Sequence, residues 1–162
     1  MRDKKDIPLN TVKGFVSVPD RIRYLNSTEN IAVLATWGDD TPYTSLVNFV
    51  LTHDLKTVVF ATPRKTKKFR NIQRSRSVAL LIDNRARTTG SLMDTEAVTI
   101  VGKARVLKKG KTMDEMKGIY VQKHRDLEDF VNADTTALIA VDIAYCVHVS
   151  SFQTVTVWDC KT

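Results

Sequence analysis

Short apolar runs separated by turn-forming residues dominate the first part of the chain after residue 30. The runs 31–36, 44–51 and 57–62 are rich in Val, Leu, Thr and Phe, and the second of them alternates between its two faces. The segments 37–43 and 52–56 contain the Gly, Asp and Pro residues that favour turns. Strands this close in sequence pair antiparallel, because parallel pairing needs a long crossover. We therefore predict an antiparallel meander.

Further apolar runs extend this pattern toward the C-terminus. Four of them have the composition of strands: 78–83, 97–109, 135–150 and 152–158. Gly102 interrupts one of these runs and predicts a bulge or bend there. Six or seven strands with helices only as insertions indicate a mainly β fold, a six- to seven-stranded antiparallel β-barrel that is closed or partly closed. The 162 residues fit a single domain with one core, spanning residues 1–162.

Other segments predict helices and loops between the strands. Residues 17–30 begin with a Ser-x-Pro signal for a helix start, and a short basic helix capped by Thr66 follows the third strand. Residues 111–134 have helical periodicity, which we expect to form two pieces. The polar stretch 84–94 predicts a mobile loop, and residues 1–16 predict an N-terminal arm.

Composition narrows the function classes without choosing one. The formal charge of +7, from 25 basic and 18 acidic residues, suits nucleic acid, an acidic membrane surface or a phosphorylated small ligand. No run of about 18 apolar residues could span a bilayer, and the N-terminus lacks the apolar segment of a secretory signal. Cys146 and Cys160 do not have metal-site spacing, so we expect a cytoplasmic protein with reduced thiols. His53, His124 and His148 are scattered, and we expect no metal site.

Seven Lys and Arg residues between positions 64 and 76 form the main chemical signal. The predicted helix begins directly after a strand, so its unpaired N–H groups would point toward the same place as the hydroxyls of Thr62 and Thr66. Lys67 or Lys68 would add an ammonium group there. This combination suits a terminal phosphate. A solvated, basic helix face is the alternative that charge alone leaves open.

The same segment contains a sequence motif at residues 66–72. The string TKKFRNI at residues 66–72, with Val78 six residues later, matches a Ser/Thr, basic, Lys, any, basic, Asn, Leu pattern. The Pro-x-x-Ser sequence at 42–45 supports it, whereas Arg76 stands where the pattern often has Pro. Residues 31–107 thereby resemble the pyridoxamine 5'-phosphate oxidase-like family of split barrels that bind flavin mononucleotide (FMN), with the barrel-closing strands in 136–158.

The resemblance implies a homodimer that binds FMN at the subunit interface. Lys68 would be the main phosphate partner, with Lys67, Thr66 and Arg64 nearby. The ribityl chain and ring would be contacted by Thr62 and Pro63. The isoalloxazine would lie along residues that contribute mainly backbone groups, namely Ser45, Leu46, Val47 and Asn48. From the second subunit we expect Trp158 and either Arg85 or Arg87.

The resemblance also bears on the reaction. Flavin chemistry needs no protein nucleophile, which fits a chain without a Ser/His/Asp or Cys/His constellation, and the catalytic residues stay undefined. True pyridoxamine 5'-phosphate oxidases have extra basic residues near the C-terminus, and the last twelve residues here contain no Arg. We therefore expect an FMN-dependent oxidoreductase acting on another small molecule, a flavin reductase or an electron carrier.

Three alternatives belong to other classes of function. A reductase that uses the deazaflavin F420 would place a longer anionic tail on the same basic helix, with Arg74 and Arg76 as added partners. A nucleic-acid or regulatory binding module would use the basic face without redox chemistry, although no aromatic residues interleave with a basic strand as in RNA-binding sheets. A haem-handling relative is the most distant of the three.

Overall fold

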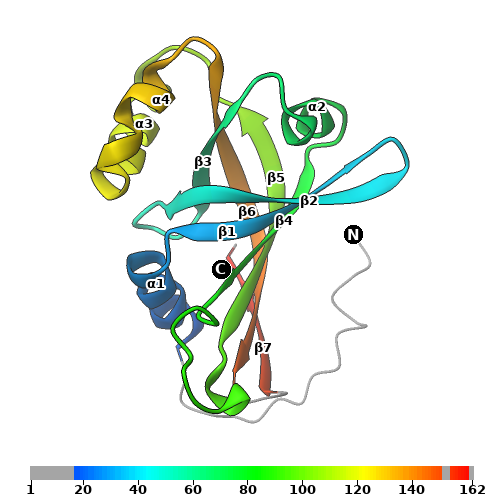
Figure 1. Ribbon diagram of the computed structural model, residues 1–162, viewed down its shortest axis with the longest axis vertical. Coiled ribbons are helices and arrows are strands. Elements are labelled where there is room, and N and C mark those ends of the chain that lie inside the picture. The colour runs from blue at the N-terminus through cyan, green and yellow to red at the C-terminus, as the bar shows by residue number, and fades with distance from the viewer. Residues whose placement is uncertain (1–16, 151–153, 161–162) are drawn as a thin grey trace.

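Seven antiparallel strands form one sheet, which the computed structural model describes over residues 17–150 and 154–160. The sheet order is β3-β2-β1-β4-β5-β6-β7, and an additional β3–β6 pairing closes the first six strands into a barrel (Figure 1). The strands are β1 (Ile31–Gly38), β2 (Thr41–Leu51), β3 (Thr57–Pro63), β4 (Ser77–Asp83), β5 (Ala97–Val106), β6 (Thr136–Ser150) and β7 (Thr154–Asp159). The prediction of a mainly β, antiparallel split barrel is confirmed.

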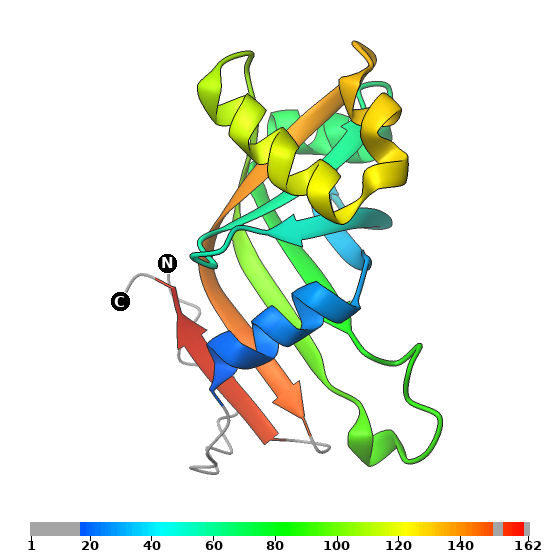
Figure 2. The same cartoon turned by 90° about the vertical axis from the view of Figure 1, so that its left-hand side faces the viewer.

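The helices cover the barrel at three places. They are α1 (Val18–Thr28), α2 (Lys67–Arg74), α3 (Lys111–Lys123) and α4 (Glu128–Asn132), with short 3₁₀ turns η1 (Leu92–Asp94) and η2 (Arg125–Leu127). The helix α1 lies across the lower part of the barrel, and α3 and α4 cover the outer face of β3 and β6 (Figure 2). The apolar face of α1, with Ile22 and Leu25 fully buried, contributes to the core inside the barrel. A second apolar cluster, which includes Val59, Leu138 and Tyr120, lies beneath α3 and α4.

The hairpin between β1 and β2 is tighter than the sequence predicted. The predicted turn over residues 37–43 is confirmed in its place but is too long, because β1 continues to Gly38 and β2 begins at Thr41. Asp39 and Asp40 alone make the turn, with φ angles of 53° and 56°. Two central residues with positive φ match the right-handed twist of the flanking strands, and Asp tolerates this conformation. The hairpin therefore projects past the barrel beside α2 (Figure 1).

The predicted irregularity at Gly102 is confirmed. The register between β5 and β6 shifts between Val101 and Gly102. A Cβ atom at Gly102 would lie 2.4 Å from the carbonyl oxygen of Asp142, so the two backbones approach too closely for any side chain. The strand ends at Val106, three residues before the predicted end, and Leu107 still donates its N–H to Leu138.

The predicted loop over residues 84–94 lies between β4 and β5. The stretch 84–94 is an irregular loop with one 3₁₀ turn, and its mobility stays a prediction. The predicted arm over 1–16 and the first residues of the last predicted strand lie outside the described residues. Within the described ranges, none of the helices has the length and apolar character needed to cross a membrane.

Candidate functional site

The strands β2 and β3 separate where the sequence predicted that they would lie side by side. They pair only over three positions, from Phe49 opposite Phe60 to Leu51 opposite Val58. Beyond that point β2 pairs with β1 alone, and Thr62 pairs with Ala137 of β6. The antiparallel meander predicted for these strands therefore has only a short β2–β3 ladder. Among the described strands, none pairs with the edge of β2 that this separation leaves open.

The free edge of β2 presents backbone groups at alternate residues. Phe49 donates its N–H to the carbonyl of Asn30 on the β1 side. Because the bonding direction alternates along an antiparallel strand, Leu46 and Asn48 direct their N–H and C=O groups to the free edge. The Lys68 side chain reaches this edge, and its Nζ donates to the Leu46 carbonyl oxygen at 2.9 Å. The structure thus joins the basic helix to the strand predicted to hold the flavin ring.

The helix α2 is fixed in place by three buried side chains. Phe69 and Ile72 are 6% and 2% exposed and point into the barrel core. Asn71 lies between them, 2% exposed, and its Nδ2 donates to the Thr36 hydroxyl of β1 at 3.0 Å. A Cβ atom at Gly38 would lie 2.1 Å from Asn71 Oδ1, so the glycine leaves the space that this amide occupies. The Asn of the motif therefore docks the helix onto β1.

Two threonine hydroxyls meet where β3 ends and α2 begins. Thr66 caps the helix, since its Oγ1 accepts from the Phe69 N–H at 3.3 Å. The same hydroxyl lies 3.1 Å from Thr62 Oγ1 and 3.0 Å from the Pro63 carbonyl oxygen. Thr62 is only 1% exposed, which holds this pair of hydroxyls at a fixed position. The predicted cap and the predicted neighbourhood of Thr62 and Thr66 are confirmed.

The first turn of α2 has an unusual charge. Helix N-termini are partly positive and favour acidic residues, yet this turn begins with Lys67 and Lys68 and contains no acid. Burial lowers the pKa of Lys68 below its ordinary value. Lys67 Nζ lies 5.0 Å from the centre of the Tyr43 ring. A bound anion would relieve the repulsion that this arrangement builds in.

The other predicted ring-contacting residues lie along β2 in different environments. Leu46 is 62% exposed on the outer face, whereas Val47 is buried in the core. Ser45 Oγ is buried and makes no hydrogen bond within the part of the chain that the structure describes. Asn48 places its amide 3.5 Å from the Asn30 carbonyl. An orphaned buried hydroxyl next to a free strand edge is typical of a site that a ligand completes.

Arg64 lies just before the cap of α2, and its guanidinium lies 5.9 Å from the centre of the Phe69 ring, whereas Trp158 lies in another part of the barrel. Arg64 is exposed and makes two hydrogen bonds to the segment before β6. Its Nε donates to the Asp134 carbonyl at 3.2 Å, and its backbone N–H donates to the Thr135 carbonyl. Trp158 lies in β7 opposite Cys146 and packs against the barrel core. In Figure 1, β7 is at the lower end of the barrel and α2 at the upper end. Within one chain, Trp158 does not join the residues of α2.

The predicted Arg85 and Arg87 line a cavity of about 450 Å³ that also includes Leu46 and Ile31. Arg87 pairs with Glu29 at 2.8 Å and also donates to the Thr28 carbonyl at the end of α1. Arg85 pairs with Asp83 at 3.0 Å. The structure therefore brings this loop to the outer face of β1 and β2 within the same chain.

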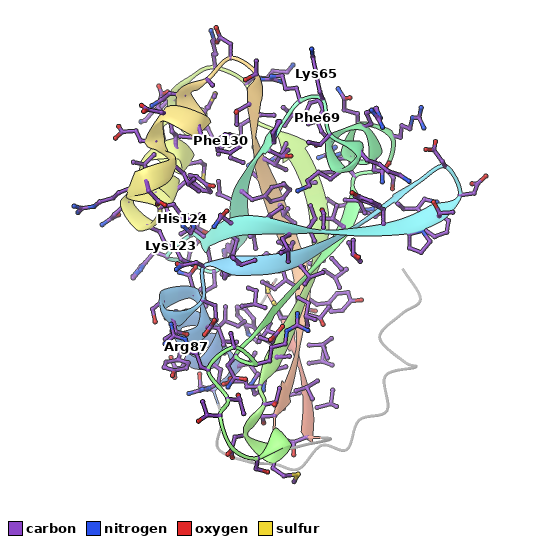
Figure 3. All side chains as sticks on the ribbon, in the orientation of Figure 1. Lys65, Phe69, Arg87, Lys123, His124 and Phe130 are labelled. Atoms are coloured by element: carbon purple, nitrogen blue, oxygen red, sulfur yellow. The ribbon has the colours of Figure 1, made fainter. Side chains whose placement is uncertain are left out.

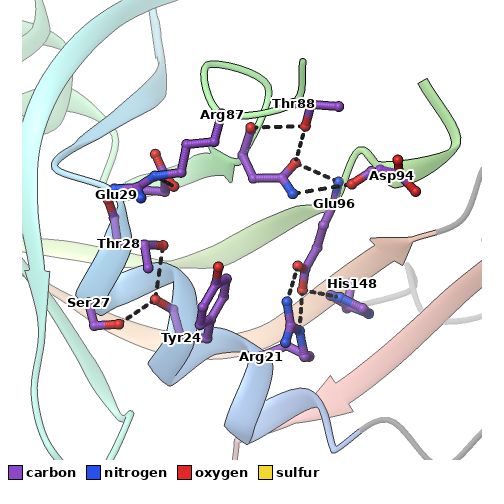
Figure 4. A network of polar contacts seen from close by, with 11 residues as sticks. Arg21, Tyr24, Ser27, Thr28, Glu29, Arg87, Thr88, Asp94, Glu96 and His148 are labelled. Carbon is purple, nitrogen blue, oxygen red and sulfur yellow. Dashed lines mark hydrogen bonds and ion pairs between the residues drawn. The ribbon is translucent and has the colours of Figure 1, made fainter. Parts of the chain in front are cut away.

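A buried polar cluster that the sequence did not predict links α1 to the barrel. The carboxylate of Glu96 accepts from the Arg21 guanidinium and from His148 Nε2, the latter at 2.9 Å (Figure 4). Glu96 and His148 are 5% and 1% exposed. Burial raises the pKa of Glu96, but the hydrogen bonds from Arg21 and His148 outweigh it, so the net pKa is below the ordinary value. The sequence did not predict this contact, because Glu96 precedes β5, His148 lies in β6, and no spacing relates the two.

Of the remaining histidines, one is buried and hydrogen-bonded and the other is exposed. His124 is 4% exposed, and its Nε2 lies 2.8 Å from the Phe49 carbonyl oxygen. His53 is exposed in the β2–β3 turn. Next to His124, on the side of the barrel away from α2, Lys123 donates to the Glu29 carbonyl at 2.7 Å, and burial lowers its pKa to about 8 (Figure 3). Among the described residues, no group of three or more His, Cys, Asp or Glu side chains could hold a metal ion.

Comparison with solved structures identifies many similar folds at low sequence identity. A heme binding protein from Mycobacterium smegmatis superposes with a TM-score of 0.79 at 13% identity, over 90% of this chain and 59% of that chain. HutZ, the heme storage protein from Vibrio cholerae, gives 0.68 at 12% identity, over 79% and 91%. A FAD-binding protein from Mesorhizobium loti gives 0.64 at 12% identity, over 81% and 92%.

These likenesses establish the fold alone, because every identity is low. The chain spans about three fifths of the length of the Mycobacterium smegmatis protein. No curated protein matches the sequence. The family profile described as pyridoxamine 5'-phosphate oxidase, however, matches residues 18–149, which include the barrel up to the end of β6 and the TKKFRNI motif on α2. The chain therefore belongs to the pyridoxamine 5'-phosphate oxidase-like family of split barrels.

Proposed function

We propose that the protein binds FMN between the free edge of β2 and the first turn of α2, and uses it as an oxidoreductase on a small molecule. The observation that carries this proposal is the Lys68 bridge. Lys68 lies in the first turn of α2, which has no acidic residue, and its ammonium group bonds to the backbone at the open edge of β2. One end of this site suits a phosphate and the other suits a flat, hydrogen-bonding ring.

The phosphate end is built from side chains that are already in position. The first turn of α2 supplies Lys67 and Lys68, and the hydroxyls of Thr62 and Thr66 lie beside it. Lys68 now donates to a neutral carbonyl while burial disfavours its charge. A phosphate dianion would restore the preference of Lys68 for the charged form, because an opposite charge stabilises the ammonium group. Arg64 would add a peripheral contact.

The ring end is built mainly from backbone. The N–H and C=O groups of Leu46 and Asn48 point to the free edge, and a flavin ring has donors and acceptors along one side that could pair with them. The unpartnered hydroxyl of Ser45 offers a further hydrogen bond. Pro63 would border the ring with apolar surface. When bound, FMN supplies the hydride or single-electron chemistry, and the chain's residues hold and orient it.

We also propose that two copies of the chain form a homodimer through the outer face of β1 and β2. The β1 residues Ile31 and Trp37 are 52% and 50% exposed, and Leu46 on β2 is 62% exposed. Leu46 lies opposite Val33, which also pairs with Leu81 of β4, so the apolar surface continues across three strands. Contiguous exposed apolar surface of this kind marks an interface. A second copy here would bring its own loop and β7, with Trp158, toward the flavin.

The two arginines that would bind the longer tail of F420 already have partners in the fold, which favours FMN as the cofactor. Arg74 is paired with Asp39, and Arg76 donates from Nε to the Ala104 carbonyl at 3.0 Å. Both would have to leave these partners to bind an extended anionic tail. The same reasoning weighs against haem, since the buried His124 and His148 already bond to the Phe49 carbonyl and to Glu96.

The decisive experiment begins with the visible spectrum of the purified protein and mass spectrometry of any released ligand. A flavin fluorescence titration of apoprotein then compares Lys68→Ala with Lys65→Ala, a matched variant of an exposed neighbouring lysine (Figure 3). We expect Lys68→Ala to weaken FMN binding by about tenfold or more, the loss of one charge-assisted hydrogen bond. Lys65→Ala should bind nearly as well as the parent. Equal affinities of Lys68→Ala and the parent would remove this site from the proposal.

A further inference from the structure

The two cysteines of the chain come together in the folded protein. The sulfurs of Cys146 and Cys160 lie 3.9 Å apart as free thiols. Cys146 is in β6, opposite Trp158, and Cys160 follows directly after the end of β7. The two residues are 0% and 7% exposed and belong to the apolar cluster inside the barrel. A disulfide bond of about 2.05 Å requires the sulfurs to approach each other by less than about 2 Å.

The two thiols have different chemical character. The two thiols share a hydrogen bond in which either sulfur can be the donor, and this bond lowers the pKa of Cys160 below its ordinary value. The same bond, together with burial, raises the pKa of Cys146. Cys160 is also the more exposed of the two. Since the thiolate is the reactive form, Cys160 is the nucleophile of the pair and Cys146 the second, resolving thiol.

The position of β7 gives reagents a route to the pair. Within residues 17–150 and 154–160, the strand lies at the edge of the sheet and pairs only with β6. All side chains of β7 are partly exposed, whereas each of the six barrel strands has fully buried side chains. Edge elements with few buried contacts open at lower free energy than the core does. Opening of the end of β7 would expose Cys160 first, because Cys160 follows the last ladder pair of Tyr145 with Asp159.

We propose that Cys146 and Cys160 form a dithiol site that hydroperoxides oxidise to a disulfide, which fastens the end of β7 to β6. The Cys160 thiolate attacks the peroxide, the O–O bond breaks, and Cys160 becomes a sulfenic acid while hydroxide leaves and takes up a proton. The Cys146 sulfur then attacks the Cys160 sulfur and releases water. Two thiols and one hydrogen peroxide give one disulfide and two waters, so two electrons pass from sulfur to oxygen.

Thiol counting on the oxidised protein tests this site without any flavin. We expect hydrogen peroxide to reduce the number of titratable thiols per chain from two to none, as measured after unfolding. The chains should not become cross-linked to one another. Peptide mapping should recover one linked pair. The disulfide should raise Tm by about 5 to 10 °C, because it restricts the unfolded chain around a short loop, and dithiothreitol should reverse the shift. A thiol count that stays at two, or links between separate chains, would overturn the proposal.

Single-cysteine variants test the order of attack. In Cys146→Ser, the remaining Cys160 should form a sulfenic acid that dimedone traps. In Cys160→Ser, the remaining Cys146 should stay unmodified under the same peroxide treatment. Equal labelling of the two variants would contradict the assigned roles. If a variant fails to fold by circular dichroism, the thiol count and peptide map of the parent protein decide the proposal alone.

Discussion

At the residue scale, Gly38 and Asn71 show how one missing side chain fixes the position of the site. Asn71 fills the space above Gly38 and bonds to Thr36, and in doing so it holds α2 against β1. The backbone of Gly38 has no special conformation that demands glycine. The requirement is the space taken by the amide, so the site depends on a residue that touches no ligand.

The variant Gly38→Ala should destabilise the protein and weaken FMN binding together. The new methyl group would meet Asn71 Oδ1 at 2.1 Å, and Asn71 is too buried to swing away. Overpacking of this kind costs about 1 to 3 kcal/mol of unfolding free energy, measured by urea denaturation. The matched control is Gly118→Ala in α3, where a methyl group meets no atom within 4 Å. That change should stabilise the helix by up to about 1 kcal/mol, and an equal loss in both variants would contradict this account.

At the scale of elements, the Glu96 cluster determines how α1 is attached. Arg21 on α1 and His148 on β6 meet one carboxylate at the start of β5 (Figure 4). The apolar contacts of Ile22 and Leu25 hold the helix on the barrel, and the polar cluster fixes its position along the barrel. This attachment should depend on pH, because the pKa of Glu96 is lowered by its partners.

A carboxylate with a folded pKa below its unfolded value of about 4.5 stabilises the fold above that value. This contribution disappears as the pH falls through the folded pKa. We therefore expect Glu96→Gln to lose about 1 to 2 kcal/mol of unfolding free energy at pH 7, since Arg21 loses its buried partner but stays partly solvated. The difference between variant and parent should shrink below about pH 4.5. Urea midpoints across pH 3 to 7 measure it, with the exposed Glu115→Gln as control. A difference that is constant over this range would disprove the role of the charge.

At the scale of the whole molecule, the apolar outer face of β1 and β2 predicts the dimer. The variant Ile31→Lys places a charge on this face and should give a monomer of 18.3 kDa by light scattering. The parent should have twice that mass. Tyr24→Lys, a comparable change on exposed α1, should leave the dimer intact. If the parent is monomeric with FMN bound, the second subunit has no part in the site.

Much of the fold followed from local signals in the sequence. Alternation predicted the strands, the interrupted run at Gly102 predicted the bulge, and Thr66 predicted the cap of α2. Contacts between distant segments gave no such signal. The separation of β2 from β3, the cluster around Glu96 and the approach of the two thiols depend on how the barrel closes. Periodicity reports which face of a strand is buried, and it does not report which neighbour the strand meets.

The closure of the barrel also sets an order of events during synthesis. Thr57 pairs with Asp142 and Pro63 with Thr136, so β3 stays without its second neighbour until the C-terminal part of the chain has left the ribosome. Until then the nascent chain exposes unpaired strand edges, which are prone to pair with other chains. Pairings between such distant segments also form slowly. The cell would have to protect the emerging polypeptide during this interval, and its yield in expression would depend on chaperones more than on the stability of the finished barrel.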